Sequence, residues 1–175
     1  KDQYQLRAGE VSDPDSLVSA SLYLADRMEL LVGMFGIGNV PTGEKDPFGL
    51  RRAALGAISV FEALGAVGNT TGSSVLALTE LLAFTRETFA AGLIADSTDA
   101  AVSAFIYERY RNLLATLHDR AAVDAVIALT PPLDEVVARV KAVVEFQRVP
   151  EADALAAANK RIRNILRKAD AVPSA

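Results

Sequence analysis

Cysteine is absent from the 175-residue sequence. Its absence excludes disulfides, thiolate nucleophiles and cysteine-ligated zinc, and it is compatible with a reducing cytoplasm. Tryptophan is also absent, aromatic residues make up only 6% of the chain, and His118 is the single histidine. Because metal and acid–base sites need converging partners, and none is visible near His118, a catalytic or metal role for this residue is not favoured.

Long apolar runs are missing as well, so the sequence predicts neither a membrane span nor a signal peptide. The sequence begins with Lys1 and not with Met, and we expect it to be a piece of a longer protein. The formal net charge of −4 argues weakly against a dedicated nucleic-acid binder. The cations are unevenly placed, however, since residues 160–168 carry five cations and no acid.

Alanine and leucine dominate the sequence, and hydrophobic residues make up 51% of it. This composition favours helix over strand, and no alternating strand pattern of useful length occurs. Capping residues and helical spacing predict an all-α fold, an irregular bundle of about six to seven helices. The expected helices cover residues 12–35, 46–65, 75–90, 99–117, 120–129, 133–148 and 150–171.

A glycine-rich segment, residues 33–43, separates the first two expected helices. Gly38 and Gly43 have the spacing of a phosphate-binding loop, but Glu44 stands where the loop needs its lysine, and a helix precedes it where a strand is required. We therefore interpret the segment as a connector between helices. Templates for hydrolase and protease sites also find no match, so no catalytic residue is predicted.

Asp26 interrupts an apolar row of the first expected helix, made of Val18, Leu22 and Leu30. Its carboxylate should therefore be partly buried and need a partner, which Arg51 or Arg52 could supply. We interpret Asp26 as structural, with a metal ligand as the alternative.

Two groups of cations are candidates for binding phosphate. The first surrounds the start of the second expected helix, where we expect Asp46 to act as a structural cap. The second lies on the last helix, opposite an apolar stripe formed by Leu155, Ala158, Ile162, Ile165 or Leu166, and Ala169. In both cases a solvated or salt-bridged face is the open alternative. The candidate residues are Lys45, Arg51, Arg52, Lys160, Arg161, Arg163, Arg167 and Lys168.

Three segments carry a family resemblance. They read LADRMELLVGMFGIG at residues 24–38, PTGEKDPFGLRRAALG at residues 41–56 and LAAANKRIRNIL at residues 155–166. Together they resemble the beta subunit of the bacterial-type glycyl-tRNA synthetase, and the resemblance spans about residues 17–168. It places this chain in the C-terminal half of that subunit.

The resemblance implies a division into three parts. Residues 1–70 would be the end of an HD-like helical domain, residues 71–150 the following helical region, and residues 151–175 the opening helix of a truncated anticodon-binding domain. Asp26 matches the terminal Asp of HD-type domains, but the other ligands of such a domain have no counterpart here. The resemblance therefore implies no bound metal in this chain.

The resemblance also implies the function. In this family the alpha subunit activates glycine with ATP and magnesium, and the beta subunit binds and positions glycine tRNA within a cytoplasmic alpha2beta2 tetramer. The chain would then support a glycine–tRNA ligase while being inactive alone, without membrane or DNA partners. An alternative is a scaffold whose cations pair with Asp26, Glu29 or Asp46 and never touch RNA. A third is a hydrolase built on the HD-like helix.

Overall fold

The computed structural model describes residues 14–68 and 76–170. Within these ranges the chain forms seven α-helices, one short 3-10 helix and no strand, which confirms the all-α prediction. The expected tail at residues 1–10 and most of the expected turn at residues 68–72 lie outside the described residues. The helices are α1 (Pro14–Gly36), α2 (Leu50–Gly68), α3 (Leu78–Glu87), α4 (Thr98–Leu114), α5 (Arg120–Ile127), α6 (Val136–Phe146), preceded by η2 (Leu133–Glu135), and α7 (Ala152–Asp170).

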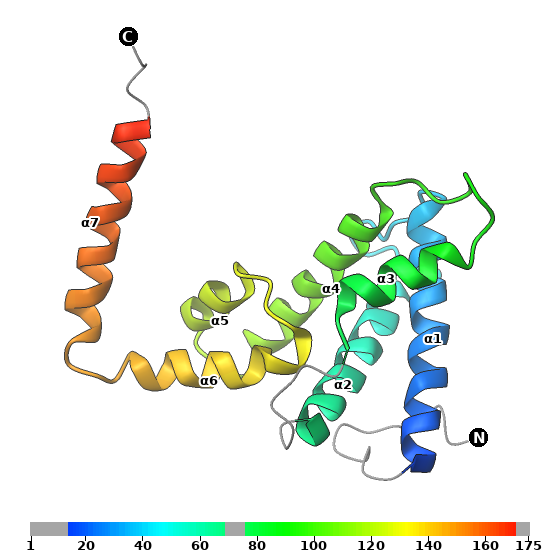
Figure 1. The fold of residues 1–175 in the computed structure, drawn as a ribbon, viewed down its shortest axis with the longest axis horizontal. Helices are drawn as coiled ribbons and strands as arrows, with labels where there is room; N and C mark the ends of the chain where they lie inside the picture. The colour runs from blue at the N-terminus through cyan, green and yellow to red at the C-terminus, as the bar shows by residue number, and fades with distance from the viewer. Residues whose placement is uncertain (1–13, 69–75, 171–175) are drawn as a thin grey trace.

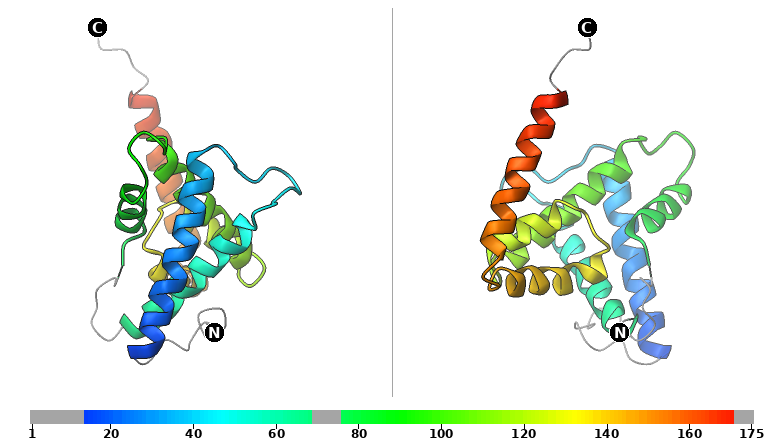
Figure 2. Two further views of the ribbon diagram at one scale, coloured as in Figure 1. Left: turned by 90° about the vertical axis from the view of Figure 1, so that its right-hand side faces the viewer. Right: turned by 60° about the vertical axis from the view of Figure 1, so that its left-hand side comes forward.

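Three helices, α1, α2 and α4, pack against one another and form the centre of the bundle (Figure 1). Helix α3 covers α1 and α4, η2 packs against α2, and α5 lies between α4 and α6. Helix α7 projects away from the rest, as the two turned views also show (Figure 2). The bundle therefore comprises α1 to α6.

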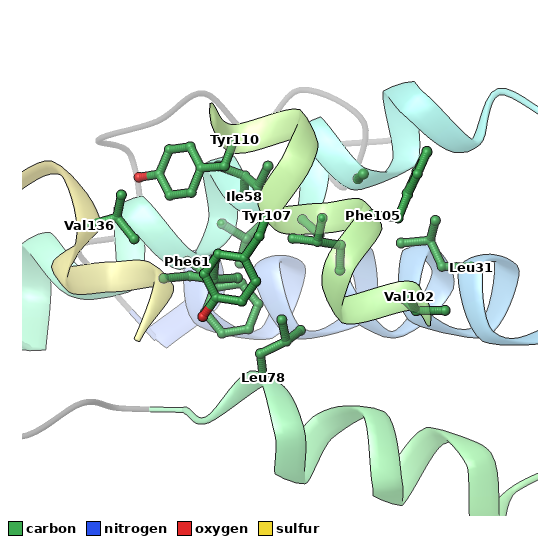
Figure 3. Packing of buried hydrophobic residues seen from close by; sticks show 14 of the residues in the cluster. Leu31, Ile58, Phe61, Leu78, Val102, Phe105, Tyr107, Tyr110 and Val136 are labelled. Atoms are coloured by element: carbon green, nitrogen blue, oxygen red, sulfur yellow. The ribbon is translucent and has the colours of Figure 1, made fainter. Parts of the chain in front are cut away.

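The core is continuous from α1 to α6 because each helix contributes residues at helical spacing. Helix α1 buries Leu24, Met28, Leu31 and Phe35, and the ring of Phe35 packs 5.1 Å from that of Phe105 on α4. Figure 3 shows how the buried side chains of α2, α4 and η2–α6 meet around this layer. Residues 14–68 and 76–146 thus share one core, while the division into three domains stays a prediction.

Two buried tyrosines attach α4 to its neighbours (Figure 3). The hydroxyl of Tyr110 donates to Glu62 Oε1 on α2 at 2.7 Å, and that of Tyr107 donates to the backbone oxygen of Pro131. Burial, more than the nearby carboxylates, raises the pKa of both tyrosines. Both therefore remain neutral donors that satisfy otherwise costly buried polar groups.

The second apolar row expected on α1 is not buried. Val18 is 60% exposed and Leu22 is 57% exposed, and only Leu30 of this row packs partly against the core. The expectation that Asp26 is partly buried is wrong for the same reason, since its side chain is 61% exposed. The apolar row does lie along one face of α1, as its spacing indicates. The described part of the bundle, however, covers only the opposite face of the helix.

Gly56 on α2 lies against the Tyr23 side chain of α1. A Cβ atom at this position would lie 2.3 Å from the Tyr23 hydroxyl oxygen and 3.0 Å from its Cζ. The Arg27 guanidinium lies over the Tyr23 ring, 4.6 Å from the ring centroid. A side chain at position 56 would therefore require Tyr23, and with it the Arg27 contact, to move.

We predict that Gly56→Ala destabilises the chain by about 1–2 kcal/mol, because steric overlap outweighs the ~1 kcal/mol gain in helix propensity. Tyr23→Phe removes the closest atom and should restore part of the loss. Urea unfolding of both single variants and the double variant measures the coupling. A Gly56→Ala chain more stable than wild type would contradict the prediction.

The contact between α4 and α5 predicts a pH dependence. Arg111 Nε donates to Asp124 Oδ1 at 2.6 Å, and this hydrogen bond lowers the pKa of the Asp124 carboxyl below its usual value. A carboxyl with a depressed folded-state pKa stabilises the fold above its ordinary pKa of about 3.9 and loses that effect as the pH falls further.

The difference in free energy of unfolding between wild type and Asp124→Asn should therefore become smaller as the pH drops below about 4. Chemical unfolding over a series of pH values tests this. If this difference in free energy is the same at every pH, the Arg111–Asp124 pair has no electrostatic role in stability.

Candidate nucleic-acid interface

The connection between α1 and α2, residues 37–49, is held in a defined conformation. Thr42 and Lys45 exchange backbone hydrogen bonds of 3.1 Å and 2.8 Å across a tight turn. Gly43 within this turn has φ +50° and Gly49 just before α2 has φ +68°, values that favour glycine. Gly38 and Gly43 thus lie in a connector as predicted, but the prediction that it starts at residue 33 is wrong, since residues 33–36 belong to α1.

Asp46 precedes α2 and caps its first turn. Its Oδ1 accepts from the backbone N–H of Leu50 at 2.8 Å, and its Oδ2 accepts from that of Arg51 at 3.0 Å. The helix begins at Leu50 and not at Asp46 as expected, because Asp46 reaches forward over Gly49 to cap it. The carboxylate fills the place where a phosphate could bind the helix N-terminus, so only side chains remain as phosphate ligands here.

The three cations of this region differ in what they contact. Arg51 is partly buried and donates from Nη2 to the backbone oxygen of Gly43, which ties the turn to α2. Arg52 is exposed, and its guanidinium lies along Gly49, where a Cβ atom would be 3.0 Å from Nη2. Lys45 is exposed at the end of the turn. Within the described residues none of the three forms an ion pair.

The prediction that Arg51 or Arg52 pairs with Asp26 is therefore also wrong. Its carboxylate pairs with the adjacent Arg27 at 3.0 Å and not with Arg51 or Arg52. An exposed pair between neighbours in sequence contributes little to stability. The alternative of a scaffold held by ion pairs of Lys45, Arg51 and Arg52 with Asp26, Glu29 or Asp46 is not what the structure shows.

Helix α7 is almost entirely exposed. Among its described side chains only Ala152, at 6% exposure, is buried. The predicted apolar stripe remains uncovered, with Leu155 61% exposed and Ile162 56% exposed. The five cations are exposed too, and within the described part of the chain none of them forms an ion pair or a side-chain hydrogen bond. They are Lys160, Arg161, Arg163, Arg167 and Lys168.

The structure brings the predicted cations together only as two separate groups. Lys45, Arg51 and Arg52 lie at the α1–α2 connection, whereas the other five follow α7 on the far side of the molecule from α1 (Figure 1). Successive helical residues are 100° apart, so Lys160, Arg163 and Arg167 share one face of α7, with Arg161 and Lys168 beside it.

Phe48 is the residue whose position the sequence analysis missed. It falls within the helix expected over residues 46–65, but it precedes α2 and is 46% exposed. The available signal was its position between Pro47 and Gly49, since both residues interrupt regular structure.

Other kinds of site find little support. Over residues 14–68 and 76–170 the structure shows no group of three or more acidic, histidine or cysteine side chains that could hold a metal ion. His118 follows α4 in a turn and its backbone N–H bonds to the oxygen of Leu114. None of the described helices has the length and apolarity to cross a membrane.

Comparison with known proteins gives consistent matches. The model of the family "Glycyl-tRNA synthetase beta subunit" matches residues 1–128. The "Glycine--tRNA ligase beta subunit" of Neisseria meningitidis serogroup C is 41% identical over 169 residues, which are 96% of this chain and 23% of that protein. Its counterpart in Aromatoleum aromaticum is 45% identical over 170 residues, 95% of this chain and 23% of that protein. The chain thus spans about a quarter of the length of these relatives.

The capping role of Asp46 yields a prediction. Asp46→Ala removes both acceptors at the start of α2 and should lower the free energy of unfolding by about 1 kcal/mol. Amide hydrogen exchange at Leu50 and Arg51 should accelerate. The control is Glu44→Ala, which removes an exposed carboxylate from the same turn. Equal effects of the two variants would show that charge, and not capping, is responsible.

Proposed function

This chain belongs to the glycyl-tRNA synthetase beta-subunit family, and on that basis we propose that it supports ATP-dependent attachment of glycine to its tRNA by binding and positioning the tRNA. The proposal places the whole protein in the cytoplasm as an alpha2beta2 tetramer, with ATP and magnesium used by the alpha subunit. This chain contributes no catalytic residue to the reaction.

The observation that carries the proposal is the free basic face of α7. Its five cations are exposed and lack ion-pair partners within the described chain. Unneutralised cations hold a layer of counterions, and binding a phosphate backbone releases them, which drives association. A cation that already pairs with a carboxylate, such as Arg139 with Glu135 at 2.6 Å, gains less from binding a phosphate, because it must first give up that partner.

The form of α7 also suits a phosphate backbone. The helix runs for 19 residues, and its sequence contains neither glycine nor proline. Its rise of about 1.5 Å per residue spreads the cations over about 12 Å. The three arginines add planar guanidinium groups that can bind phosphate oxygens through two parallel hydrogen bonds.

The cations at the α1–α2 connection have a divided role in this proposal. Arg51 acts as a structural residue, because its guanidinium already donates a hydrogen bond to the backbone oxygen of Gly43. Lys45 and Arg52 stay candidates for RNA contact. A structural role without RNA contact, the alternative for the whole chain, is thereby supported for Arg51 alone.

We predict that Arg163→Glu with Arg167→Glu, introduced into the full-length protein, weakens binding of glycine tRNA about tenfold or more at moderate salt. Each lost phosphate contact should reduce the slope of log K against log salt concentration by about 0.7–0.9. Fluorescence anisotropy with labelled tRNA over a salt series measures both quantities.

The matched control reverses two exposed cations of α6, Arg139→Glu with Lys141→Glu, so that the net charge changes equally. The control should leave affinity and slope close to wild type. If the α7 variant folds normally and binds tRNA as wild type does, α7 is not part of the interface.

A further inference from the structure

Phe48 is an aromatic side chain in an unusual place. It is 46% exposed, while Leu50, two residues later, is 1% exposed. Ile37 and Val40 in the same connection are also exposed, at 54% and 45%. Large apolar side chains gathered in one exposed segment mark binding sites more often than neutral surface.

The backbone that carries Phe48 is fixed from both sides. On one side, Thr42 and Lys45 close the turn, and Arg51 holds Gly43. On the other side, the Asp46 carboxylate binds the first backbone N–H groups of α2. A partner that binds the ring therefore does not have to order the loop first, which removes a usual cost of binding.

Two cations lie close to Phe48 in the sequence, and neither forms an ion pair within the described residues. Lys45 stands three residues before Phe48, and Arg52 four residues after it. The Arg52 guanidinium lies against Gly49, the residue that follows Phe48, as the 3.0 Å distance from Nη2 to a Cβ built there shows. Asp46, the nearest carboxylate in sequence, is already engaged by two N–H groups.

We propose that Lys45, Phe48 and Arg52, here called the Phe48 element, bind unpaired nucleotides of RNA. An exposed aromatic ring stacks on a base face, and cations on either side bind the phosphates that flank that base. Bases within a duplex are already stacked and paired, so the ring selects single-stranded nucleotides. The inference rests on the proposed function, since it assigns the kind of RNA structure that this part of the chain contacts.

The charges favour RNA over a protein partner. The buried centre of a protein–protein interface is depleted of lysine, although arginine is enriched there. A protein docking on Phe48 would have to desolvate Lys45 or supply a carboxylate for it. A nucleotide strand supplies a phosphate on each side of every base, which matches an aromatic residue with one cation before it and one after it in the sequence.

The test compares Phe48→Ala with Phe48→Tyr in the full-length protein. The probes are a labelled single-stranded oligouridine and a blunt-ended RNA duplex made of two fully complementary strands. Phe84→Ala is the matched control, because Phe84 on α3 is 68% exposed and belongs to neither basic group. Crosslinking to glycine tRNA that contains 4-thiouridine, followed by peptide mapping, reports contact at residues 41–52 directly.

Phe48→Ala should weaken oligouridine binding roughly five- to hundredfold, without changing its salt slope, because stacking involves no counterion release. Phe48→Tyr should keep most of the affinity, and Phe84→Ala should have no effect. Lys45→Ala and Arg52→Ala should each reduce the slope by about 0.7, the value for a single strand. Binding of the RNA duplex should be unchanged in Phe48→Ala.

Equal loss of oligouridine and duplex binding in Phe48→Ala would overturn the inference, as would unchanged binding of both. Loss of a co-purifying protein subunit with normal RNA binding would assign the Phe48 element to protein contact instead, which also overturns it. The α7 charge reversal separates the two proposals. If that variant loses tRNA affinity while Phe48→Ala does not, the Phe48 element fails and the proposed function stands.

Discussion

The close contact of α1 with α2 is the constraint on which the rest of the structure depends. At Gly56 a Cβ atom would lie 2.3 Å from the Tyr23 hydroxyl oxygen, so this position of α2 accepts a side chain only if Tyr23 moves. Helix α1 ends and helix α2 begins at the 37–49 connection, and the two helices pack against each other. Their packing therefore fixes the positions of both ends of the connection that carries Phe48.

Helix number and type could be predicted from the sequence because they depend on local signals. Helical spacing of apolar residues and stops such as Pro131 act over a few residues. The cap of α5, where the Asp119 side chain accepts from the N–H of Ala122, is equally local, although the sequence analysis did not name it. Helix boundaries were predicted less accurately where a contact between residues several positions apart decides the end of the helix. Helix α2 starts at Leu50 and not at Asp46, because the Asp46 carboxylate accepts the backbone N–H of Leu50 and so caps the helix from outside. Gly49, which lies between them, has a positive φ.

Burial and pairing could not be predicted, since they depend on which elements meet. The row of Val18 and Leu22 reads as a buried face, yet nothing in the described residues covers it. Arg51 reads as an ion-pair partner for Asp26, but it binds a backbone oxygen. A carbonyl acceptor leaves no mark in a sequence, because every residue has one. For the candidate site, the sequence identified the cations and missed the aromatic ring between two of them.

The attachment of α7 has a mechanical consequence. The helix is about 28 Å long, and its first residue, Ala152, is the only buried one among its described side chains. The five cations lie about 12–24 Å from Ala152 along the helix. A change of about 10° in the direction of the helix axis at Ala152 would displace the far end by about 5 Å, so small changes of angle become large displacements of charge. Under the proposed function, the fit of these cations to phosphates would therefore depend on whatever restrains the angle of α7.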